Sequence, residues 1–589
     1  MNEKLKEILL KVEKPARYIG GEYNTPLMHK GEKVRAAICF TDIYEIAMSN
    51  LGIQILYDIL NSHPDVICER CFAPWTDFAA ELKKAGLPLF SLETKKPLAE
   101  FDLLGFSCQY ELSFTNILYM LDLAGIPFYS ADRGENWPLV IAGGPCMANP
   151  EPIADFFDLI VIGDGEEVFL QIALLAAKYK GDKKGLLKEA AKLGGVYVPS
   201  LCEVSGGVCV TPVKKAVVAD LDKAPYPEKP LVPNIQPVHD RLTLELFRGC
   251  YSGCRFCQAG FYYRPIRLRS SATLLKSAER LIAGTGREEI GLSALSSGDY
   301  PDIGGVVKGI TEIARPQGVR VQLPSLRLDS FEAEITGGSR LSSLTFAPEA
   351  GTQRLRDVIN KNITEEDIRK SMTAAFNRGY QTVKLYFMLG LPTENYEDLD
   401  GIAETVRKIR ELYYSVRRDK RIKINVSANI FIPKPFTPFQ WAEQLAAKEA
   451  LDRCLYLRDK LADIKGVKFS YSDNRVAELE GVMARGDRTL AEVIEKAYRN
   501  GCIFDGWSEY FKPDGWDKAF QGIDKDNFLR ERSTDEALPW DFIDIGVSKG
   551  YLKKEYRKGL EGKTTPSCKY KCTGCGADTL ALCKGGGND

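Results

Sequence analysis

Three cysteines stand close together in the run Arg248-Gly-Cys-Tyr-Ser-Gly-Cys-Arg-Phe-Cys-Gln-Ala-Gly260, at positions Cys250, Cys254 and Cys257. Iron–sulfur clusters are held by Cys thiolates, normally four of them. A loop that supplies only three leaves one iron of a [4Fe–4S] cube open to a small molecule. The spacing therefore predicts an iron–sulfur cluster with an open coordination position, and a zinc site or an incidental triplet is the alternative.

A second set of cysteines lies near the end of the sequence. Cys568, Cys572 and Cys575 repeat the spacing of the first set, and Cys583 follows after seven further residues. Four thiolates complete a metal site without an open position, which suits structural zinc or an auxiliary [4Fe–4S] cluster. Thiol spacing leaves that choice open, and we expect a structural rather than a catalytic role.

Basic residues gather around this second set. Between Lys549 and Cys572 eight Lys or Arg side chains accompany two Glu, although the whole chain, with 79 basic and 80 acidic residues, has a net charge of −1. A basic segment can track the phosphates of RNA, but a solvated charged helix is the commoner explanation of such a run. An RNA partner, bound by a small cysteine knuckle, is therefore kept as an alternative.

The composition is typical of a folded protein with several domains. The 589 residues are 44% hydrophobic and 10% aromatic, and single cores stop growing beyond about 250–300 residues. No signal peptide is evident, and no stretch approaches the roughly 20 apolar residues that span a bilayer. We expect a cytoplasmic protein without membrane contact, whose sixteen cysteines are metal ligands or buried thiols rather than disulfides.

The elements that must position the first cysteine loop fall into two α/β halves, separated by five prolines between Pro225 and Pro237. Upstream, apolar runs at 34–40, 103–108, 139–142 and 159–162 alternate with helical periods, which predicts a doubly wound, Rossmann-like parallel sheet. Downstream, six strand-like runs separated by helical stretches predict a partial (β/α)6 barrel; they are 242–246, 290–295, 319–323, 343–346, 382–388 and 424–430. The cysteine loop follows the first of these strands, at the end of the barrel where sites gather.

These observations give an α/β fold class with a small C-terminal, α-rich region that contains the second cysteine set. The predicted divisions are an N-terminal extension (1–30), a Rossmann-like domain (31–210), a proline-rich linker (211–240), a partial TIM barrel (241–465), a helical domain (466–555) and a basic four-cysteine tail (556–589).

The spacing Cys-x3-Cys-x2-Cys, with Phe256 before the last cysteine, resembles the signature of the radical SAM superfamily. The resemblance implies that the open iron binds the amino and carboxylate groups of S-adenosylmethionine (SAM), and that an electron from the cluster cleaves SAM to a 5′-deoxyadenosyl radical. It also implies a low-potential electron donor, such as flavodoxin or ferredoxin. The cofactor supplies the chemistry, and the protein aims it.

Later motifs are similar to the segments that contact SAM in this superfamily. The resemblance assigns cofactor-binding roles to Ser297, Gly298 and Asp299 after the second barrel strand, to Glu349 and Arg354 after the fourth, and to Lys384 and Pro392 on and after the fifth. As an alternative, Glu349 and Arg354 are a helix N-terminal acid and a surface base.

The upstream half resembles the cobalamin-binding domain that precedes the barrel in many radical SAM proteins. The motifs are Ile141-Ala-Gly-Gly-Pro-Cys and Ile162-Gly-Asp-Gly-Glu-Glu167, and glycines after a strand let the backbone approach a bulky ligand. The resemblance assigns the cobalamin to a set of residues at the strand ends: Ser107, Gln109, Gly143, Gly144, Pro145, Gly163, Gly165 and Glu166.

The loop after the first strand departs from the pattern of cobalamin mutases, where Asp-x-His-x-x-Gly supplies a His ligand to cobalt. Here Asp42 is kept, but Tyr44 stands where the His would be. A phenol with a pKa near 10 is a poor cobalt donor, so we expect base-off cobalamin without a strong protein ligand. The alternative is that Tyr44 is a core or surface aromatic and that this alignment is mistaken.

Together these motifs resemble an uncharacterised group of fused cobalamin-binding radical SAM proteins. The resemblance implies a cobalamin-dependent radical SAM enzyme, with a methyltransferase acting on an unactivated carbon as the main hypothesis. In that reaction the substrate radical captures methyl from methylcobalamin. A cyclase or rearrangement catalyst is the alternative within enzymology, and an RNA- or ribosome-associated cofactor-binding protein is the alternative outside it. The substrate is left open.

Overall fold

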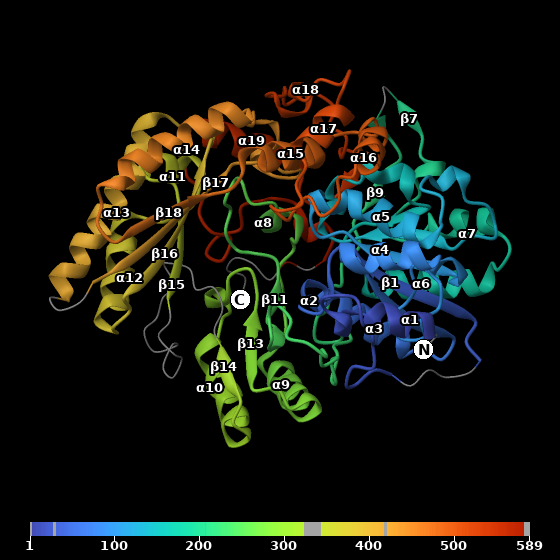
Figure 1. The fold of residues 1–589 in the computed structure, drawn as a ribbon. Coiled ribbons are helices and arrows are strands. Elements are labelled where there is room, and N and C mark those ends of the chain that lie inside the picture. The colour runs from blue at the N-terminus through green and yellow to red at the C-terminus, as the bar shows by residue number, and fades with distance from the viewer. Residues whose placement is uncertain are drawn as a thin grey trace.

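A computed structural model describes residues 3–26, 31–205, 208–322, 343–417, 421–581 and 583 of the chain. Figure 1 shows the upstream α/β domain beside the strands of the barrel half, with helices of the C-terminal region lying across both. The two halves predicted from the sequence are therefore packed together, and the C-terminal region joins them.

The upstream domain is built on one six-stranded sheet with the order β2-β1-β3-β4-β5-β6. Neighbours from β2 to β5 pair in parallel, and β6 is antiparallel to β5. The strands are β1 (Val34–Phe40), β2 (Val66–Phe72), β3 (Leu103–Ser107), β4 (Leu139–Gly143), β5 (Leu159–Val161) and β6 (Val196–Tyr197). The order 2-1-3-4-5 is that of doubly wound folds, in which ligands bind where the strand order reverses.

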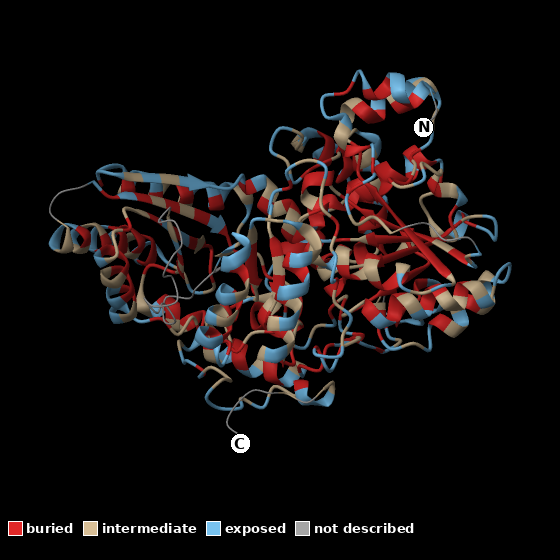
Figure 2. Ribbon diagram, turned by 90° about the horizontal axis from the view of Figure 1, so that it is seen from below, coloured by how far each residue is buried: buried red, intermediate tan, exposed pale blue. Residues whose placement is uncertain are grey.

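Helices cover both faces of this sheet. The helices of the domain are α1 (Glu3–Leu9), α2 (Tyr44–Ala47), α3 (Leu51–Asn61), α4 (Thr76–Ala85), α5 (Phe114–Ala124), α6 (Glu166–Lys178) and α7 (Lys183–Ala190). The side chains of α3, α6 and α7 share one apolar core, whereas those of α1, α4 and α5 belong to another that continues into the C-terminal region. In Figure 2 the strands of this sheet are almost wholly buried. The doubly wound, Rossmann-like prediction is confirmed.

The barrel half contains two parallel sheets. β10 (Leu242–Glu245), β13 (Glu289–Ser293) and β14 (Arg320–Gln322) form the first, and β15 (Leu344–Glu349), β16 (Thr382–Leu389), β17 (Lys423–Ile430) and β18 (Val467–Tyr471) form the second. The first six strands match the six predicted runs, and β18 is a seventh that the sequence prediction did not include. Within the described ranges the strands form no closed ring, which agrees with the prediction of a partial barrel.

Helices separate these strands in the expected alternation. They are α8 (Gln258–Tyr262), α9 (Ser271–Thr285), α10 (Ile303–Ala314), α11 (Gln353–Val358), α12 (Glu365–Asn377), α13 (Tyr396–Val416) and α14 (Ala447–Ala462). A short antiparallel pair, β11 (Phe247–Arg248) with β12 (Arg267–Leu268), closes the base of the cysteine loop. The loop is therefore held at both ends by backbone pairing.

The C-terminal region returns to both halves of the molecule. Its elements are α15 (Asn474–Arg485), α16 (Leu490–Arg499), α17 (Pro513–Ala519), α18 (Asp526–Leu529), β19 (Ile543–Asp544) and α19 (Lys549–Leu560). α16 packs on α5 of the upstream domain, and α19 packs on α11 of the barrel half. β19 pairs in parallel with β9 (Val213–Lys214), at the start of the predicted linker. The exact domain limits given above stay predictions.

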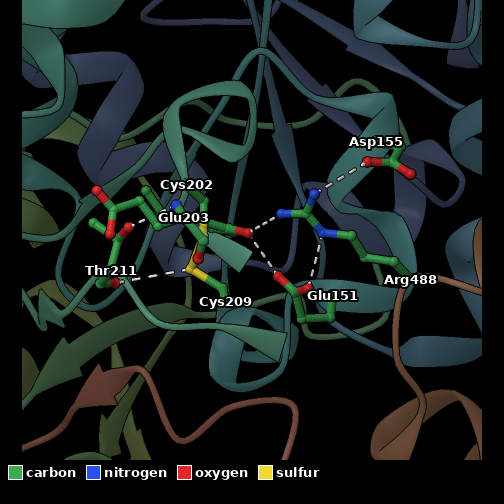
Figure 3. The surroundings of a disulfide bond; sticks show 8 residues. Glu151, Asp155, Cys202, Glu203, Cys209, Thr211 and Arg488 are labelled. Carbon is green, nitrogen blue, oxygen red and sulfur yellow. Dashed lines mark hydrogen bonds and ion pairs between the residues drawn. A yellow bond between two sulfur atoms is a disulfide. The ribbon is translucent and has the colours of Figure 1, made fainter. Parts of the chain in front are cut away.

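One expectation about the cysteines is wrong. Cys202 and Cys209 form a disulfide, although all sixteen cysteines were expected to be ligands or reduced thiols. Cys202 lies two residues before β7 (Val204–Ser205), and Cys209 is the last residue of β8 (Val208–Cys209). The pairing of these two strands brings the Cα atoms of the cysteines to 6.0 Å. Figure 3 shows the bridge beside Glu203 and Thr211. The hairpin register brings the two cysteines together, and a count of cysteines could not reveal this.

The described helices include none that is both long enough and apolar enough to cross a membrane.

An aromatic cluster joins the C-terminal region to the upstream domain. Phe504 is 1% exposed and contacts the rings of Trp75, Tyr119 and Tyr510 at centroid distances of 5.0, 5.9 and 6.0 Å. Its backbone N–H donates to the side-chain oxygen of Asn116 at 2.8 Å. Phe504 is therefore a central contact between the two regions.

We expect Phe504→Ala to lower the free energy of unfolding by about 3–5 kcal/mol, because it leaves a cavity among packed rings. Urea unfolding followed by tryptophan fluorescence measures the change. Tyr570→Ala, at a side chain that is 78% exposed, is the matched control and should be neutral. Equal effects of the two substitutions would show that the cluster does not hold the region in place.

Candidate functional site

A cavity of about 450 Å³ lies between the upstream domain and the barrel half. It opens at the carboxyl ends of β3, β4 and β5, beside the point where the strand order reverses. All eight strand-end residues assigned to cobalamin line it: Ser107, Gln109, Gly143, Gly144, Pro145, Gly163, Gly165 and Glu166. The structure therefore brings these residues together around one space of a size typical of ligand sites.

Glycines make the floor of this cavity. A Cβ on Gly144 would lie 2.5 Å from the carbonyl oxygen of Cys108, and one on Gly163 would lie 2.2 Å from that of Ala216, so both positions require glycine for the backbone to pack. Their φ angles of 107° and 105° also favour glycine. Gly143 differs, because a Cβ there would meet only the carbonyl oxygen of Val161, at 3.9 Å. The missing side chain of Gly143 therefore leaves room inside the cavity.

The N-terminal turn of α3 forms another wall, which the sequence analysis missed. Asn50, Leu51, Gly52 and Ile55 line the cavity. Asn50 also caps the helix, since its side-chain oxygen accepts from the backbone N–H of Ile53 at 3.1 Å. The cap followed by a glycine was the available sequence signal.

Asp42 and Tyr44, which were assigned to the lower face of cobalamin, do not line this cavity. The Oδ1 of Asp42 accepts from the indole N–H of Trp507 at 3.2 Å. Tyr44 is 2% exposed, and its hydroxyl oxygen accepts from the backbone N–H of Asn234 at 3.0 Å. The predicted place of these two residues at the cofactor is not what the structure shows, because the chain forms the short helix α2 at Tyr44. After β1 the chain returns to the cavity at Asn50. Tyr44 is a core aromatic, as the alternative held.

The barrel half supplies the opposite wall. Glu245, Phe247, Arg248 and Gly249, on and after β10, line the cavity together with Tyr263 from the far end of the cysteine loop. Gly249 is the residue directly before Cys250. The cavity therefore extends from the glycine floor of the upstream domain to the first residue of the cysteine loop.

A buried ion-pair network, which we call the Arg248 clamp, joins the two walls. The guanidinium of Arg248 lies 3.2 Å from Asp164, 2.5 Å from Glu166 and 2.9 Å from Glu245. Asp164 and Glu166 belong to the upstream domain, whereas Arg248 and Glu245 belong to the barrel half. One cation thus holds carboxylates from both sides of the cavity.

Two further arginines complete the Arg248 clamp. Arg267 pairs with Asp164, and Arg269 lies 3.0 Å from Glu245. Burial by itself raises the pKa of Asp164, but Arg267 and Arg248 lower it below its usual value. The pKa of Glu245 is lowered in the same way, against burial, by Arg248 and Arg269. The carboxylates are therefore ionised at neutral pH, and the clamp is an assembly of full charges.

The cysteine loop is partly buried and fixed from outside. Cys250, Cys254 and Cys257 are all of intermediate exposure, and the Asn360 side chain donates to the carbonyl oxygen of Gly253 at 3.0 Å. Burial, followed by the neighbouring Cys254, raises the pKa of Cys257 to about 12. Thiols in such mutual proximity suit a shared, positively charged iron cluster, which would stabilise the thiolates.

Neither cysteine set is arranged around a single ion. In the part of the chain that the structure describes, no group of three or more His, Cys, Asp or Glu side chains is placed to hold one metal ion. A [4Fe–4S] cube binds each thiolate on a different iron, so its ligands need not converge on one point. The three thiolates of the first loop can therefore serve a cube that keeps one iron open.

The residues assigned to SAM fall into two groups. Close to the cysteine loop, the Lys361 ammonium lies 5.9 Å from the ring centroid of Phe256 and 3.2 Å from Glu349. Glu349 has a φ of 67°, a strained conformation that non-glycine residues keep mainly at functional sites. Ser297 Oγ and Asp299 Oδ2 are buried and have no hydrogen-bond partner among the described residues. These polar atoms have capacity for a ligand.

Of the other assigned residues, Gly298 belongs with Ser297 and Asp299, whereas Arg354, Pro392 and Lys384 form the second group. Arg354 pairs with Asp398 and donates to the Thr393 carbonyl oxygen at 3.0 Å, in the turn that contains Pro392. Arg354 is exposed, which agrees with the alternative in which it is a surface base. Gly298 lies between Ser297 and Asp299 in a single 3-10 turn. Lys384 is exposed on β16, in register with Thr345 of β15 and Asn425 of β17.

Ion pairs occupy much of the basic segment. Lys549, Lys553, Lys558, Lys563 and Lys569 pair with Asp541, Asp535, Glu555, Glu561 and Asp299. A paired ammonium is less available to a phosphate than a free one. The ion pairs agree with the explanation of the segment as a solvated charged helix.

The fold and the site define a class: a parallel α/β domain shares a ligand cavity with a partial barrel whose first strand leads into a three-cysteine loop. Two family models match the chain, "Radical SAM proteins, N-terminal" over residues 52–199 and "Radical SAM superfamily" over residues 244–406. The chain belongs to the radical SAM superfamily and is a radical SAM enzyme.

Relatives and solved structures give further comparisons. "Uncharacterized protein MJ0966" of Methanocaldococcus jannaschii is 28% identical over 477 residues, covering 78% of this chain and 90% of that protein. The radical SAM methyltransferase TsrM from Kitasatospora setae, with tryptophan and a SAM analogue bound, superposes with a TM-score of 0.45 at 12% identity, over 71% of this chain and 76% of that one. OxsB, a cobalamin-dependent radical SAM enzyme, gives 0.37 at 14% identity, over 81% and 56%.

We expect Arg248→Met to destabilise the protein by about 3–5 kcal/mol at neutral pH, since it leaves buried carboxylates short of a cation. In the wild type the lowered pKa values of Asp164 and Glu245 give stability that is present above the unfolded pKa of about 4 and lost as pH falls through the folded values. In the variant those pKa values rise toward or above their unfolded values, so its stability falls relative to that of the wild type as pH increases.

Denaturant unfolding at several pH values measures this difference. It should be small near pH 4 and should grow toward pH 7. Lys192→Met, which removes an exposed ion pair with Glu189, is the control and should show no such trend. A difference that does not depend on pH would mean that Arg248 acts only through packing.

Proposed function

We propose that this protein is a cobalamin-dependent radical SAM enzyme that methylates an unactivated carbon of its substrate. The observation that carries the proposal is the single cavity that extends from the glycine floor of the upstream domain to Gly249, next to Cys250. A cofactor in that cavity would lie beside whatever the cysteine loop binds. Two cofactors that cooperate on one substrate require such an arrangement.

The cavity suits a broad and largely apolar ligand such as the corrin ring. Backbone at Gly143, Gly144 and Gly163 forms one side, and Leu51 and Ile55 form part of another. None of the described lining residues is a His, Cys or Lys, so no strong nitrogen or sulfur donor faces the space. We infer that cobalamin binds base-off without a protein ligand to cobalt. The residues of the cavity walls support this inference, whereas Tyr44 lies outside the cavity.

The cysteine loop and its surroundings suit SAM on a [4Fe–4S] cluster. Cys250, Cys254 and Cys257 would supply three thiolates and leave one iron open. Asp299 Oδ2 and Ser297 Oγ, which lack partners among the described side chains, can accept from an ammonium or a ribose hydroxyl. Glu349, Phe256 and Lys361 lie together beside the loop and would position the rest of the molecule.

When bound, the cofactors supply hydrogen abstraction by a 5′-deoxyadenosyl radical and methyl transfer from cobalamin. The protein's part is to orient them: the Arg248 clamp fixes the cavity walls relative to the loop, and burial keeps water from the reacting groups. A low-potential protein such as flavodoxin or ferredoxin would supply the electrons. A cobalamin enzyme that rearranges or cyclises its substrate is the second candidate, because it would use the same cavity.

We expect Gly143→Leu to weaken cobalamin binding by at least about tenfold, since the new side chain would occupy the space that a ligand needs. The fold should survive, because an added Cβ meets only one backbone atom. Ultraviolet–visible titration with cobalamin measures the affinity, and circular dichroism checks the fold. Gly134→Leu is the matched control, because a Cβ there meets nothing within 4 Å. Unchanged affinity in Gly143→Leu would remove cobalamin from this cavity.

The reaction itself is tested with protein reconstituted anaerobically with iron, sulfide and methylcobalamin, to which SAM and a low-potential reductant are added. We expect 5′-deoxyadenosine from the wild type and none from the Cys250→Ala/Cys254→Ala/Cys257→Ala variant. Mass spectrometry of products then separates the two candidates, because a methyltransferase adds one methylene and also forms S-adenosylhomocysteine. Absence of 5′-deoxyadenosine from a fully clustered wild type, with cell extract present as substrate source, would contradict the proposal.

A further inference from the structure

The C-terminal tail lies against the cysteine loop. The backbone N–H of Cys568 donates to the carbonyl oxygen of Tyr251 at 3.0 Å, and the hydroxyl of Ser567 donates to the same oxygen at 3.1 Å. Lys569 pairs with Asp299 at 3.8 Å. Cys568, the first cysteine of the tail, is therefore hydrogen-bonded to Tyr251, which directly follows Cys250.

More contacts fasten the tail just before its cysteines. The backbone N–H of Thr565 donates to the Asn360 side-chain oxygen at 2.7 Å, while the amide nitrogen of Asn360 donates to Gly253 at 3.0 Å. Asn362 donates to the Thr565 carbonyl oxygen at 3.0 Å. Asn360 thus holds the tail with one end of its amide and the cysteine loop with the other. The two segments form one structural unit.

A buried arginine faces the tail thiols. Arg264 is 3% exposed, and its charge interacts with the thiols of Cys575 and Cys568. Its Nε donates to the carbonyl oxygen of Gly260 at 2.9 Å, and its Nη2 donates to the carbonyl oxygen of Ser252 at 3.3 Å. Apart from the interaction of the guanidinium with the Cys575 side chain, its Nη1 has no hydrogen-bond partner among the residues that the structure describes.

The hydroxyl of Ser252, a residue that is 5% exposed, also has no hydrogen-bond partner among the described residues. A buried donor without a partner costs about 1–3 kcal/mol, more for a charged group. Arg264 Nη1, which faces the tail thiols, therefore points to an anionic group that accepts its hydrogen bond, and the buried Ser252 hydroxyl is a further unused donor.

We propose that Cys568, Cys572, Cys575 and Cys583 bind a second iron–sulfur cluster, which fastens the tail to the cysteine loop and thereby holds Tyr251 and Asp299 in position. The proposal goes beyond the proposed function, because it does not depend on SAM, cobalamin or substrate. Arg264 would donate from Nη1 to a sulfur of this cluster, and hydrogen bonds to sulfur are among the means by which proteins tune such clusters.

Thiol spacing alone leaves zinc open, but the loop whose spacing the tail repeats is the one assigned above to an iron–sulfur cluster. The tail repeats the Cys-x3-Cys-x2-Cys spacing of that loop, and Cys583 adds the fourth ligand that closes a cube. The four-cysteine tail is thus assigned to iron and sulfide.

The experiment measures iron, sulfide and zinc in the anaerobically reconstituted full chain. We expect about eight irons and eight sulfides per chain in the wild type, and about four of each in Cys572→Ser/Cys575→Ser and in Cys254→Ser/Cys257→Ser. Cys202→Ser/Cys209→Ser also removes two thiols, from the disulfide hairpin, and should keep all eight irons. Electron paramagnetic resonance should show two interacting clusters in the reduced wild type. Cys572→Ser/Cys575→Ser and Cys254→Ser/Cys257→Ser should each show only one cluster.

The wild-type measurement does not depend on any variant folding. Four irons with one zinc per chain would overturn the proposal in favour of a structural zinc site, and four irons without zinc would mean that the tail binds no metal. A second measurement tests the positioning role. Iron in the first cluster of Cys572→Ser/Cys575→Ser should pass to a chelator at least about tenfold faster than in Cys202→Ser/Cys209→Ser, because a tail without its cluster would leave the cysteine loop uncovered more often. Equal rates would overturn that role.

Discussion

The guanidinium of Arg248 is a charged contact between the two α/β halves of the molecule. It contacts carboxylates from both halves, and it stands two residues before the first cysteine of the loop. Breaking a buried pair is expensive, because the charge left behind has no water to stabilise it. Relative movement of the halves would separate these charges, so the Arg248 clamp resists the motion that would change the shape of the cavity between them.

The rest of the site follows from this constraint. The upstream sheet offers glycine backbone at its carboxyl edge, the barrel offers its first strand and the cysteine loop, and the clamp fixes one against the other. The C-terminal region strengthens the arrangement from outside: Phe504 packs into the upstream domain, and Ser567 and Cys568, after α19, bind the cysteine loop. Function therefore depends on contacts between segments that lie hundreds of residues apart, and each half alone carries only part of the cavity.

Features set by local sequence could be predicted, and those set by distant contacts could not. The cysteine loop, the glycine turns and six barrel strands follow from spacing and periodicity within short windows. Strand β2 was missed because Glu69 and Arg70 interrupt its apolar run; both are buried and paired, Arg70 with Glu22 at 2.8 Å, a partner that periodicity cannot reveal. Tyr44 was misplaced because α2 intervenes before the cavity. The Cys202–Cys209 bridge depends on hairpin register, which a count of thiols does not contain.

The contact between the tail and the cysteine loop has a consequence for how the protein is made. A chain leaves the ribosome from its N-terminus, and domains fold as they emerge. Tyr251 of the cysteine loop is synthesised 316 residues before its partner Ser567, which is followed by its second partner Cys568. One side of the loop therefore stays uncovered until Ser567 and Cys568 have been synthesised. Access to the loop from that side is widest in this interval, and docking of the later segment closes it.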